Sequence, residues 1–175
     1  MKLVFVSYVR EDHDVVDRIC EELRSRDVKV WLDREEILPG QRWRETIRGA
    51  ITEGAFFIAF FSDNYTSRDR NYMNEELTVA IEEIGLRATT ATWFIPVRIS
   101  QCRIPERSTG GGETLSDLQW VDLFGDWRKE MNKLFRAMGV SAPSEMEKYM
   151  TELAEGSILA QWQLRTEGSG ELQTQ

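Results

Sequence analysis

The run AFFIAFFS at residues 55–62 constrains the fold of this chain more than any other segment. It is apolar throughout, without the alternation expected of a strand that has one face in water. Such a run indicates a strand buried on both faces, as in a parallel sheet. Because it is the most apolar run in the sequence, we expect it to form the central strand. Four further segments are interpreted as strands, at residues 2–7, 28–33, 92–99 and 118–123.

Most of the segments that follow these strands carry apolar residues at the spacing of an amphipathic helix. The helical sets are Val15, Val16, Ile19, Cys20 and Leu23; Trp43, Ile47, Ala50 and Ile51; Leu77, Ala80, Ile81 and Ile84; and Trp127, Met131, Leu134, Phe135 and Met138. Strands that alternate with helices predict a parallel sheet covered on both faces. Pro96 lacks a backbone donor and predicts an edge or a bulge in the fourth strand. The polar, glycine-rich residues 106–116 are interpreted as a loop.

The last predicted helix is expected to end at Gly139, a residue suited to a helix C-cap. Residues 1–139 therefore form one predicted domain. Residues 140–165 are interpreted as a helical appendage, with Ser144 as the N-cap of a helix that reaches Ala154. Its apolar stripe is too short to form a core of its own, and we expect it to pack on the domain; the alternative is that it docks on a second chain or a partner protein. Residues 166–175 are expected to be disordered.

Composition narrows the classes of function. The formal net charge of −8 disfavours a nucleic-acid partner, which calls for an excess of Lys and Arg. No segment approaches the roughly 20 apolar residues of a membrane span, and the short N-terminal run lacks the features of a signal peptide. Cys20 and Cys102 are the only cysteines, and they lack the CxxC spacing of a metal or redox site. We therefore expect a cytoplasmic protein with no membrane contact and no metal.

Six short motifs occur in one order along residues 2–138: VFVSY with Arg10, WLDREEILPGQRW, FFSDNY, YMNEEL, FIPVRI with CRIP, and QWVDLF. In this order and spacing they resemble the Toll/interleukin-1 receptor (TIR) family. The second motif resembles the family's second strand and BB loop, and YMNEEL resembles the start of its third helix. The resemblance implies an α/β, flavodoxin-like three-layer sandwich with a five-stranded parallel sheet in the order 2-1-3-4-5.

The resemblance implies one of two functions, because the fold alone does not choose between them. Some TIR domains are adaptors that only bind one another. Others, many of them bacterial, cleave NAD+ at its nicotinamide–ribose bond, and some cyclise or transfer the ADP-ribose product. This cleavage expels neutral nicotinamide, so the leaving group needs no proton. One fixed carboxylate that stabilises an oxocarbenium-like ribosyl cation is then a sufficient catalytic core.

Glu76 is the candidate catalytic residue, since its place in YMNEEL matches the catalytic Glu of enzymatic TIR domains. Positions i and i+4 share a helix face, so Tyr72 and Glu76 are expected to point the same way and to wall a nicotinamide riboside pocket. The family usually has Trp at the position of Tyr72. A helix turns by roughly 100° per residue, so only one of Glu75 and Glu76 faces the cleft.

An alternative explanation for these acids is structural. Paired acids at a helix start are also ordinary solvated residues that favour the helix dipole. We expect replacement of Glu76 to leave the fold intact, because an exposed helix acid contributes little to stability.

Three further residues are candidates for substrate binding. Tyr8 and Arg10 follow the first strand, and open α/β sheets bind ligands outside the carboxyl ends of strands at the switch point, here between strands one and three. Arg10 is suited to a pyrophosphate as a bidentate donor; the alternative is a surface Arg paired with a neighbouring acid. Trp43 matches the BB-loop aromatic that lines the nicotinamide pocket in enzymatic TIR domains; the alternative is a core residue beside Ile47.

Other chemistries find less support. No GxGxxG follows the first strand and no GK[ST] follows GGGET at residues 110–114, so neither a Rossmann dehydrogenase nor a P-loop is indicated. A phospho-acceptor receiver needs an acid after the third strand, which Asp63 supplies, and a Lys after the fifth, which is not at the expected place. Asp33 is expected to anchor the BB loop, and His13 to be solvated at a helix start.

The sequence therefore predicts a TIR-domain NAD+ glycohydrolase acting in bacterial antiviral immunity, with NAD+ as substrate and no cofactor. Glu76 is the expected catalytic residue, and the expected substrate-binding residues are Tyr8, Arg10, Trp43 and Tyr72. The chain is also expected to associate head to tail with other TIR chains through residues 34–43, a contact that builds open filaments. The alternative is a non-catalytic adaptor that works by TIR–TIR association.

Overall fold

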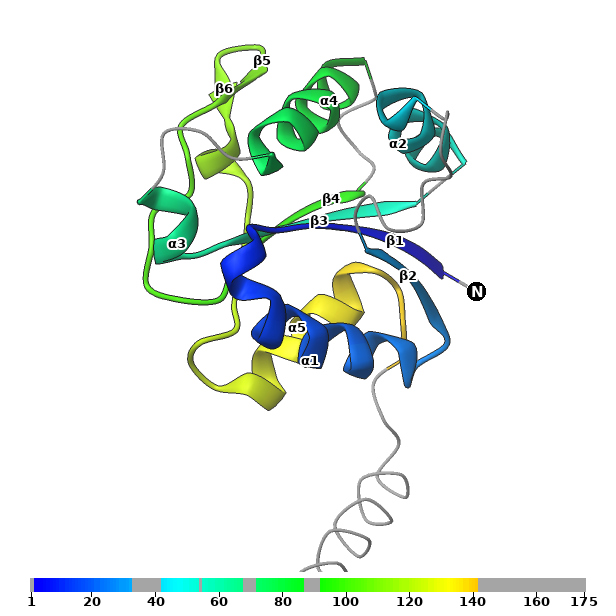
Figure 1. Cartoon of the computed structure of the whole chain (residues 1–175), viewed down its shortest axis with the longest axis vertical. Coiled ribbons are helices and arrows are strands. Elements are labelled where there is room, and N and C mark those ends of the chain that lie inside the picture. Colours follow the sequence, from blue (N-terminus) through cyan, green and yellow to red (C-terminus); the bar gives the residue numbers. More distant parts are fainter. Residues whose placement is uncertain (1, 33–41, 54, 68–71, 87–91, 142–175) are drawn as a thin grey trace, which may run out of the picture. The chain divides into compact units, whose positions relative to one another are not determined.

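The structure is a computed structural model that describes residues 2–32, 42–53, 55–67, 72–86 and 92–141. Within these residues a five-stranded parallel sheet has the order β2-β1-β3-β4-β7 (Figure 1). Its strands are β1 (Lys2–Ser7), β2 (Val28–Leu32), β3 (Phe56–Phe61), β4 (Phe94–Arg98) and β7 (Val121–Asp122). The α-helices are α1 (His13–Arg24), α2 (Trp43–Thr52), α3 (Asp63–Thr66), α4 (Met73–Leu86) and α5 (Trp127–Ala137). The predicted flavodoxin-like order is confirmed, and β3 is the central strand.

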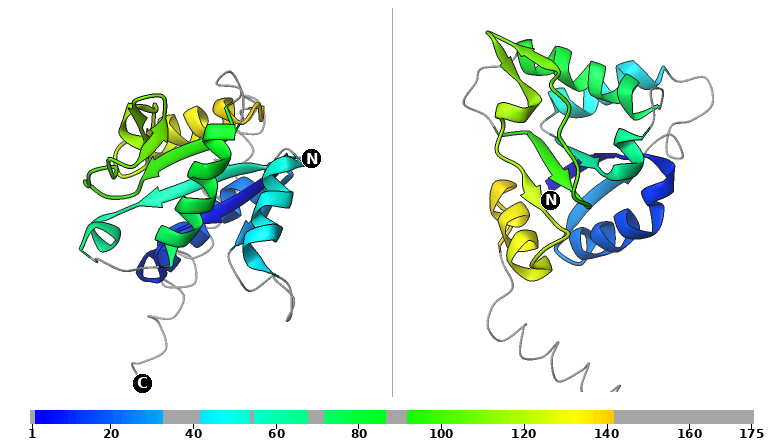
Figure 2. Two further views of the ribbon diagram at one scale, coloured as in Figure 1. Left: turned by 90° about the horizontal axis from the view of Figure 1, so that it is seen from above. Right: turned by 90° about the vertical axis from the view of Figure 1, so that its left-hand side faces the viewer.

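Helices cover both faces of the sheet, with α1 and α5 on one face and α2 and α4 on the other (Figures 1 and 2). Successive strand residues point to opposite faces. Val4, Val6, Ile58 and Phe60 therefore pack with apolar residues of α1 and α5. Phe5, Phe57, Ala59 and Phe61 pack with those of α2 and α4. Both faces of β1 and β3 are buried, which explains why these strands have continuous apolar runs rather than an alternating pattern.

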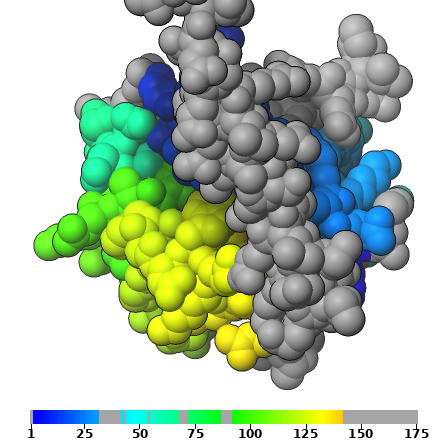
Figure 3. All heavy atoms as spheres, turned by 90° about the horizontal axis from the view of Figure 1, so that it is seen from below, coloured from blue at the N-terminus to red at the C-terminus, as the bar shows by residue number. Residues whose placement is uncertain are grey.

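Helix α5 has a defined signal at each end. The Asp126 carboxylate accepts a hydrogen bond from the backbone N–H of Lys129 at 3.1 Å and caps the N-terminus. At the other end Gly139 has φ +64°, and the N–H groups of Gly139 and Val140 donate to the carbonyls of Arg136 and Phe135. This is a Schellman motif, so the predicted cap at Gly139 is confirmed. Figure 3 shows the face on which α5 and the segment before it reach the surface.

The predicted loop at residues 106–116 is wrong. The chain forms an antiparallel hairpin there, of β5 (Ser108–Gly110) and β6 (Glu113–Thr114), followed by the 3-10 helix η3 (Leu115–Asp117). Gly110, Gly111 and Gly112 all have positive φ and form the turn. The two strands of this hairpin are short and mostly polar, so the sequence shows no hydrophobic periodicity that would predict them.

The last two strands of the main sheet also differ from expectation. Residues 118–123 were expected to form a strand, but β7 comprises Val121–Asp122 alone. It pairs with Val97 and Arg98 of β4, so among the described residues Pro96 has a strand neighbour on the β3 side, Ala59, and none on the other side. At Pro96, therefore, β4 forms the edge of the sheet, as expected, although further along it pairs with β7. The register between β3 and β4 shows no bulge.

Several predictions lie outside the described residues. These are the BB-loop residues 33–41, including Asp33, and the appendage from residue 142 onward, so the division of the chain into domains stays a prediction. Within the described residues, none of the helices combines the length and the apolar content needed to cross a bilayer.

Candidate functional site

Glu76 lies in the first turn of α4, and the residue is only 3% exposed. Ser7, the last residue of β1, donates its hydroxyl hydrogen bond to Glu76 Oε2 at 2.5 Å. The chain adds β2 on one side of β1 and β3 on the other, so the order of the strands reverses at β1, which Ser7 ends. This is the switch point outside which open α/β sheets bind ligands. The carboxylate of Glu76 therefore lies beside the switch point.

The first half of α4 is fixed by contacts from two other segments. The hydroxyl of Tyr65, in α3, donates to Asn74 Oδ1 at 2.9 Å. The guanidinium of Arg107, just before β5, donates to the carbonyl of Asn74 at 3.1 Å and to Thr78 Oγ1 at 2.7 Å. Burial raises the pKa of Tyr65, with a smaller opposing effect from Arg107. These bonds fix the first half of α4, which carries Glu76, to α3 and to the segment before β5.

Glu75 and Glu76 have different environments, as the rotation of the helix requires. Glu75 is exposed, whereas Glu76 points inward between Met73 and Leu77, which pack in the apolar cluster with Phe5. The expectation that Glu76 is an exposed helix acid is wrong, because the first turn of α4 packs directly over the end of β1. A change of Glu76 to Ala would leave the hydroxyl of Ser7 without this acceptor, so Gln is the better replacement.

Tyr72 does not share the environment of Glu76. It precedes the first helical residue, Met73, and its side chain is 68% exposed. The i, i+4 argument applies between positions inside a helix, whereas Tyr72 lies before the helix and its carbonyl accepts from the N–H groups of Glu75 and Glu76. The expectation that Tyr72 and Glu76 point the same way is therefore corrected.

Tyr8 and Arg10 both follow β1, in different surroundings. Tyr8 is half-buried, and its hydroxyl forms a hydrogen bond of 3.3 Å with Nδ1 of His13. His13 is the exposed first residue of α1, and its Nε2 lies 3.1 Å from Asp17. Arg10 is exposed in η1 (Arg10–Asp12), and its guanidinium pairs with none of the described acids. The alternative of an Arg10 pair with a neighbouring acid is not seen among these residues.

A buried polar network joins the loops after β1 and β3, and sequence reasoning missed it. Both oxygens of the Asp12 carboxylate accept hydrogen bonds, one from the hydroxyl of Ser62 and one from Nδ2 of Asn64 at 2.7 Å. The hydroxyl of Ser62 also accepts from the N–H of Tyr65 at 3.1 Å and caps α3. A signal was present, since Ser and Asn flank Asp63 directly after an apolar strand.

Comparison with known proteins identifies the family. A family model described as TIR domain matches residues 4–135. This chain belongs to the TIR domain family. Among solved structures it is similar to the TIR domain of the Toll-related receptor TRR-2 from the lower metazoan Hydra magnipapillata, with a TM-score of 0.58 and 19% identity. That match covers 77% of this chain and 96% of the Hydra chain, and at this identity it shows the fold alone. No curated protein matches the chain.

Trp43 begins α2 in this TIR domain, and its side chain lies outside what the structure describes. Ile47, four residues later, is buried in the apolar cluster under α2 and α4. Both interpretations of Trp43, as a wall of the nicotinamide pocket and as a core residue, therefore stay predictions.

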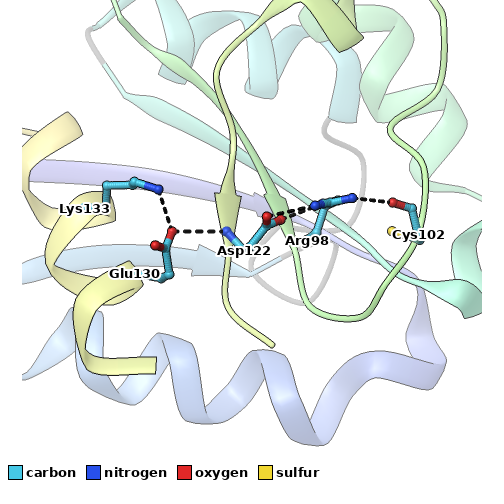
Figure 4. Close-up of polar contacts among 5 residues, drawn as sticks. All are labelled: Arg98, Cys102, Asp122, Glu130 and Lys133. Carbon is cyan, nitrogen blue, oxygen red and sulfur yellow. Dashed lines mark hydrogen bonds and ion pairs between the residues drawn. The ribbon is translucent and has the colours of Figure 1, made fainter. Parts of the chain in front are cut away.

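A second polar arrangement lies at the end of the sheet furthest from β2 (Figure 4). The guanidinium of Arg98 in β4 donates two hydrogen bonds to Asp122 in β7, at 2.6 and 2.8 Å, and a third to the carbonyl of Cys102 at 2.8 Å. It also lies over the rings of Trp120 and Phe124, at 5.2 and 5.5 Å from their centroids. These hydrogen bonds lower the pKa of Asp122 and raise that of Arg98.

The two thiols of the TIR domain, Cys20 and Cys102, are buried, and we expect them to be poor nucleophiles. Burial raises the pKa of Cys20 to about 12 and that of Cys102 to about 11. The thiolate is the nucleophile and metal ligand, so both cysteines stay protonated near neutral pH. Among the described residues no three His, Cys, Asp or Glu side chains gather in a way that would hold a metal ion.

Proposed function

We propose that this TIR domain cleaves NAD+ at the nicotinamide–ribose bond, with Glu76 as the catalytic residue. The observation that carries the proposal is the Glu76 carboxylate, buried beside the switch point and hydrogen-bonded by Ser7. Burying a carboxylate is unfavourable even when it is hydrogen-bonded. An apolar side chain between Met73 and Leu77 would fill the same place without that cost, so chemistry is the better explanation for the acid.

The chemistry that one carboxylate supplies is sufficient for this reaction. The bond between the ribose C1′ and the pyridinium nitrogen breaks, and its electron pair leaves with neutral nicotinamide. The ribosyl cation that develops is stabilised by the negative charge of Glu76, which also accepts hydrogen bonds from ribose hydroxyls. Water adds at C1′ and releases a proton to give ADP-ribose. A base nitrogen of the same molecule, in place of water, gives a cyclic product, and another acceptor gives a transfer product.

The other candidate residues have separate roles in the proposal. The exposed guanidinium of Arg10 next to β1 suits the pyrophosphate, which a bidentate donor recognises. The half-buried ring of Tyr8 lies on the same loop. Tyr72 and Trp43 are proposed to contribute aromatic surfaces toward nicotinamide. Tyr72 would do so from an exposed position before the start of α4 rather than from beside Glu76.

Incubation of the purified chain with NAD+ tests the proposal. Chromatography should show nicotinamide appearing in step with NAD+ loss, with heat-denatured protein as the blank. Separation of the second product then distinguishes ADP-ribose from a cyclic or transferred form. NAD+ loss no faster than the blank, across protein concentrations, would contradict the proposal.

The proposed setting is bacterial antiviral immunity in the cytoplasm, as the family resemblance predicts. NAD+ loss or the ADP-ribose product would then be the signal. Infection of bacteria that express the chain should lower cellular NAD+, while infected cells carrying an inactive variant should keep it. Equal NAD+ levels in the two infected cultures would contradict this setting.

A non-catalytic role through TIR–TIR association is the second candidate. The observation that favours it is the exposed aromatic pair Trp120 and Phe124 around Arg98, since exposed apolar surface often marks a contact site. For the enzymatic proposal, association through residues 34–43 should make activity rise faster than linearly with protein concentration. A chain that scatters light as an oligomer but releases no nicotinamide at any concentration would support the adaptor role instead.

A further inference from the structure

We infer that Ser7 is a positioning residue for Glu76, an inference that rests on the proposed function. Ser7 is fully buried and ends a strand whose other inward residues are apolar. It shares a face of the sheet with Phe5, because strand residues alternate. That face is covered by α2 and α4, and the residues of β3 on the same face are Phe57, Ala59 and Phe61. A hydroxyl in this apolar layer has one described acceptor, the carboxylate of Glu76.

The hydrogen bond fixes both the place and the charge of Glu76. A Glu side chain has several rotatable bonds, and anchoring Oε2 to the end of β1 restricts the carboxylate to one orientation. Burial favours the neutral acid, whereas a hydrogen bond donated to the charged form favours the carboxylate. Ser7 therefore works against protonation of Glu76. A protonated Glu76 has no negative charge with which to stabilise the ribosyl cation.

The change Ser7→Ala tests this role by deleting the hydroxyl alone. We expect kcat to fall by about ten- to a hundredfold, the range for loss of one hydrogen bond to a charged group. KM should change much less, because Ser7 is fully buried and its hydroxyl bonds to Glu76 rather than standing open to a ligand. The acid limb of the pH–rate profile should move to higher pH, because a carboxylate that has lost the hydrogen bond from Ser7 protonates more readily. Ser7→Thr keeps the hydroxyl on a residue that suits strands and should restore much of the rate.

Ser62→Ala is the matched control. Ser62 is also a buried serine at the end of a strand next to the switch point, but its hydroxyl donates to Asp12. This change removes a buried hydroxyl that donates to Asp12 and caps α3, but that forms no described hydrogen bond with Glu76. It should leave the pH profile at its wild-type position. An equal shift in both variants would mean that Ser7 acts only by holding the fold, and would overturn the inference.

A carboxyl titration followed by carbon-13 NMR gives a readout that does not depend on turnover. The signal of Glu76 is assigned by its loss in Glu76→Gln. Its titration midpoint should rise in Ser7→Ala and stay unchanged in Ser62→Ala. If wild type releases nicotinamide but Ser7→Ala matches it in kcat and midpoint, the role of Ser7 is overturned and the proposed function stands. A higher kcat in Ser7→Ala would also overturn it, because the bond would then restrain Glu76. No nicotinamide release from wild type would overturn both proposals.

Discussion

Replacement of Arg98 by Ala should destabilise the domain far more than replacement of a comparable surface Arg. Arg98 makes a bidentate pair with Asp122, a bond to the carbonyl of Cys102 and contacts with two aromatic rings, and its side chain is 20% exposed. Arg48 also pairs with acids, Glu82 and Glu83, but its side chain is 46% exposed. Replacing each of the two residues therefore compares the same interaction, an Arg–carboxylate ion pair, in a packed and in a solvated environment.

The magnitude follows from the contacts. Hydrogen bonds to charged groups contribute about 1.5–3 kcal/mol, and the partial exposure of Asp122 favours the lower part of that range. Each cation–π contact on a partly exposed ring adds about 0.5–1 kcal/mol. With the ion pair at the lower value and the two ring contacts at about 1–2 kcal/mol together, Arg98→Ala should lower the free energy of unfolding by about 2.5–3.5 kcal/mol. Arg48→Ala should lower it by about 0.5 kcal/mol, as for exposed pairs.

Urea unfolding followed by circular dichroism measures both losses. The midpoint of Arg98→Ala should fall clearly while the slope stays that of wild type, since a constant slope means a change in stability alone. Arg98→Lys keeps the charge but loses the two-pronged geometry, and should fall between wild type and Ala. Similar losses for Arg98→Ala and Arg48→Ala would refute the reasoning, because packing would then make no difference to the pair.

Three further predictions concern stability and reactivity. The pKa of Asp122 is lowered from 3.8, so its pair with Arg98 stabilises the fold above pH 3.8 and loses this effect at lower pH. The difference in unfolding free energy between wild type and Asp122→Asn should therefore narrow as the pH falls below 3.8. A difference that stays constant would count against the pair. Gly139→Ala places a side chain at positive φ, should destabilise by about 1 kcal/mol and lower Tm by a few degrees, and an unchanged Tm would contradict the strained geometry. Cys20 and Cys102 should resist maleimide at pH 8 until urea unfolds the chain, and rapid labelling of the native protein would show that they are not buried.

The sheet was predictable because its signals are local. The apolar runs of β1 and β3 follow from burial on two faces, and the four helix sets follow from their covering of one face each. The cap at Gly139 was also predictable, because a helix commonly ends with a residue at positive φ and glycine adopts that conformation without strain. The hairpin at residues 108–114 was not, because its polar strands carry no periodicity.

The site was less predictable because it depends on contacts between distant residues. Ser7 and Glu76 are 69 positions apart, and no local pattern joins them. The burial of Glu76 follows from how α4 packs over β1, and the exposure of Tyr72 follows from the residue at which the helix begins. The resemblance to TIR domains supplied Glu76, but the hydrogen bond that holds it became visible only in three dimensions.

Nicotinamide release by wild type, Glu76→Gln and Glu75→Gln, measured at equal protein concentration, tests the central claim most directly. Both changes remove one negative charge in the first turn of α4, one from a buried side chain and one from an exposed side chain. Gln at position 76 can still accept the hydrogen bond of Ser7, so Tm should not fall. The account predicts no release by Glu76→Gln and nearly full release by Glu75→Gln. Wild-type release by Glu76→Gln, or equal loss in the two variants, would contradict it.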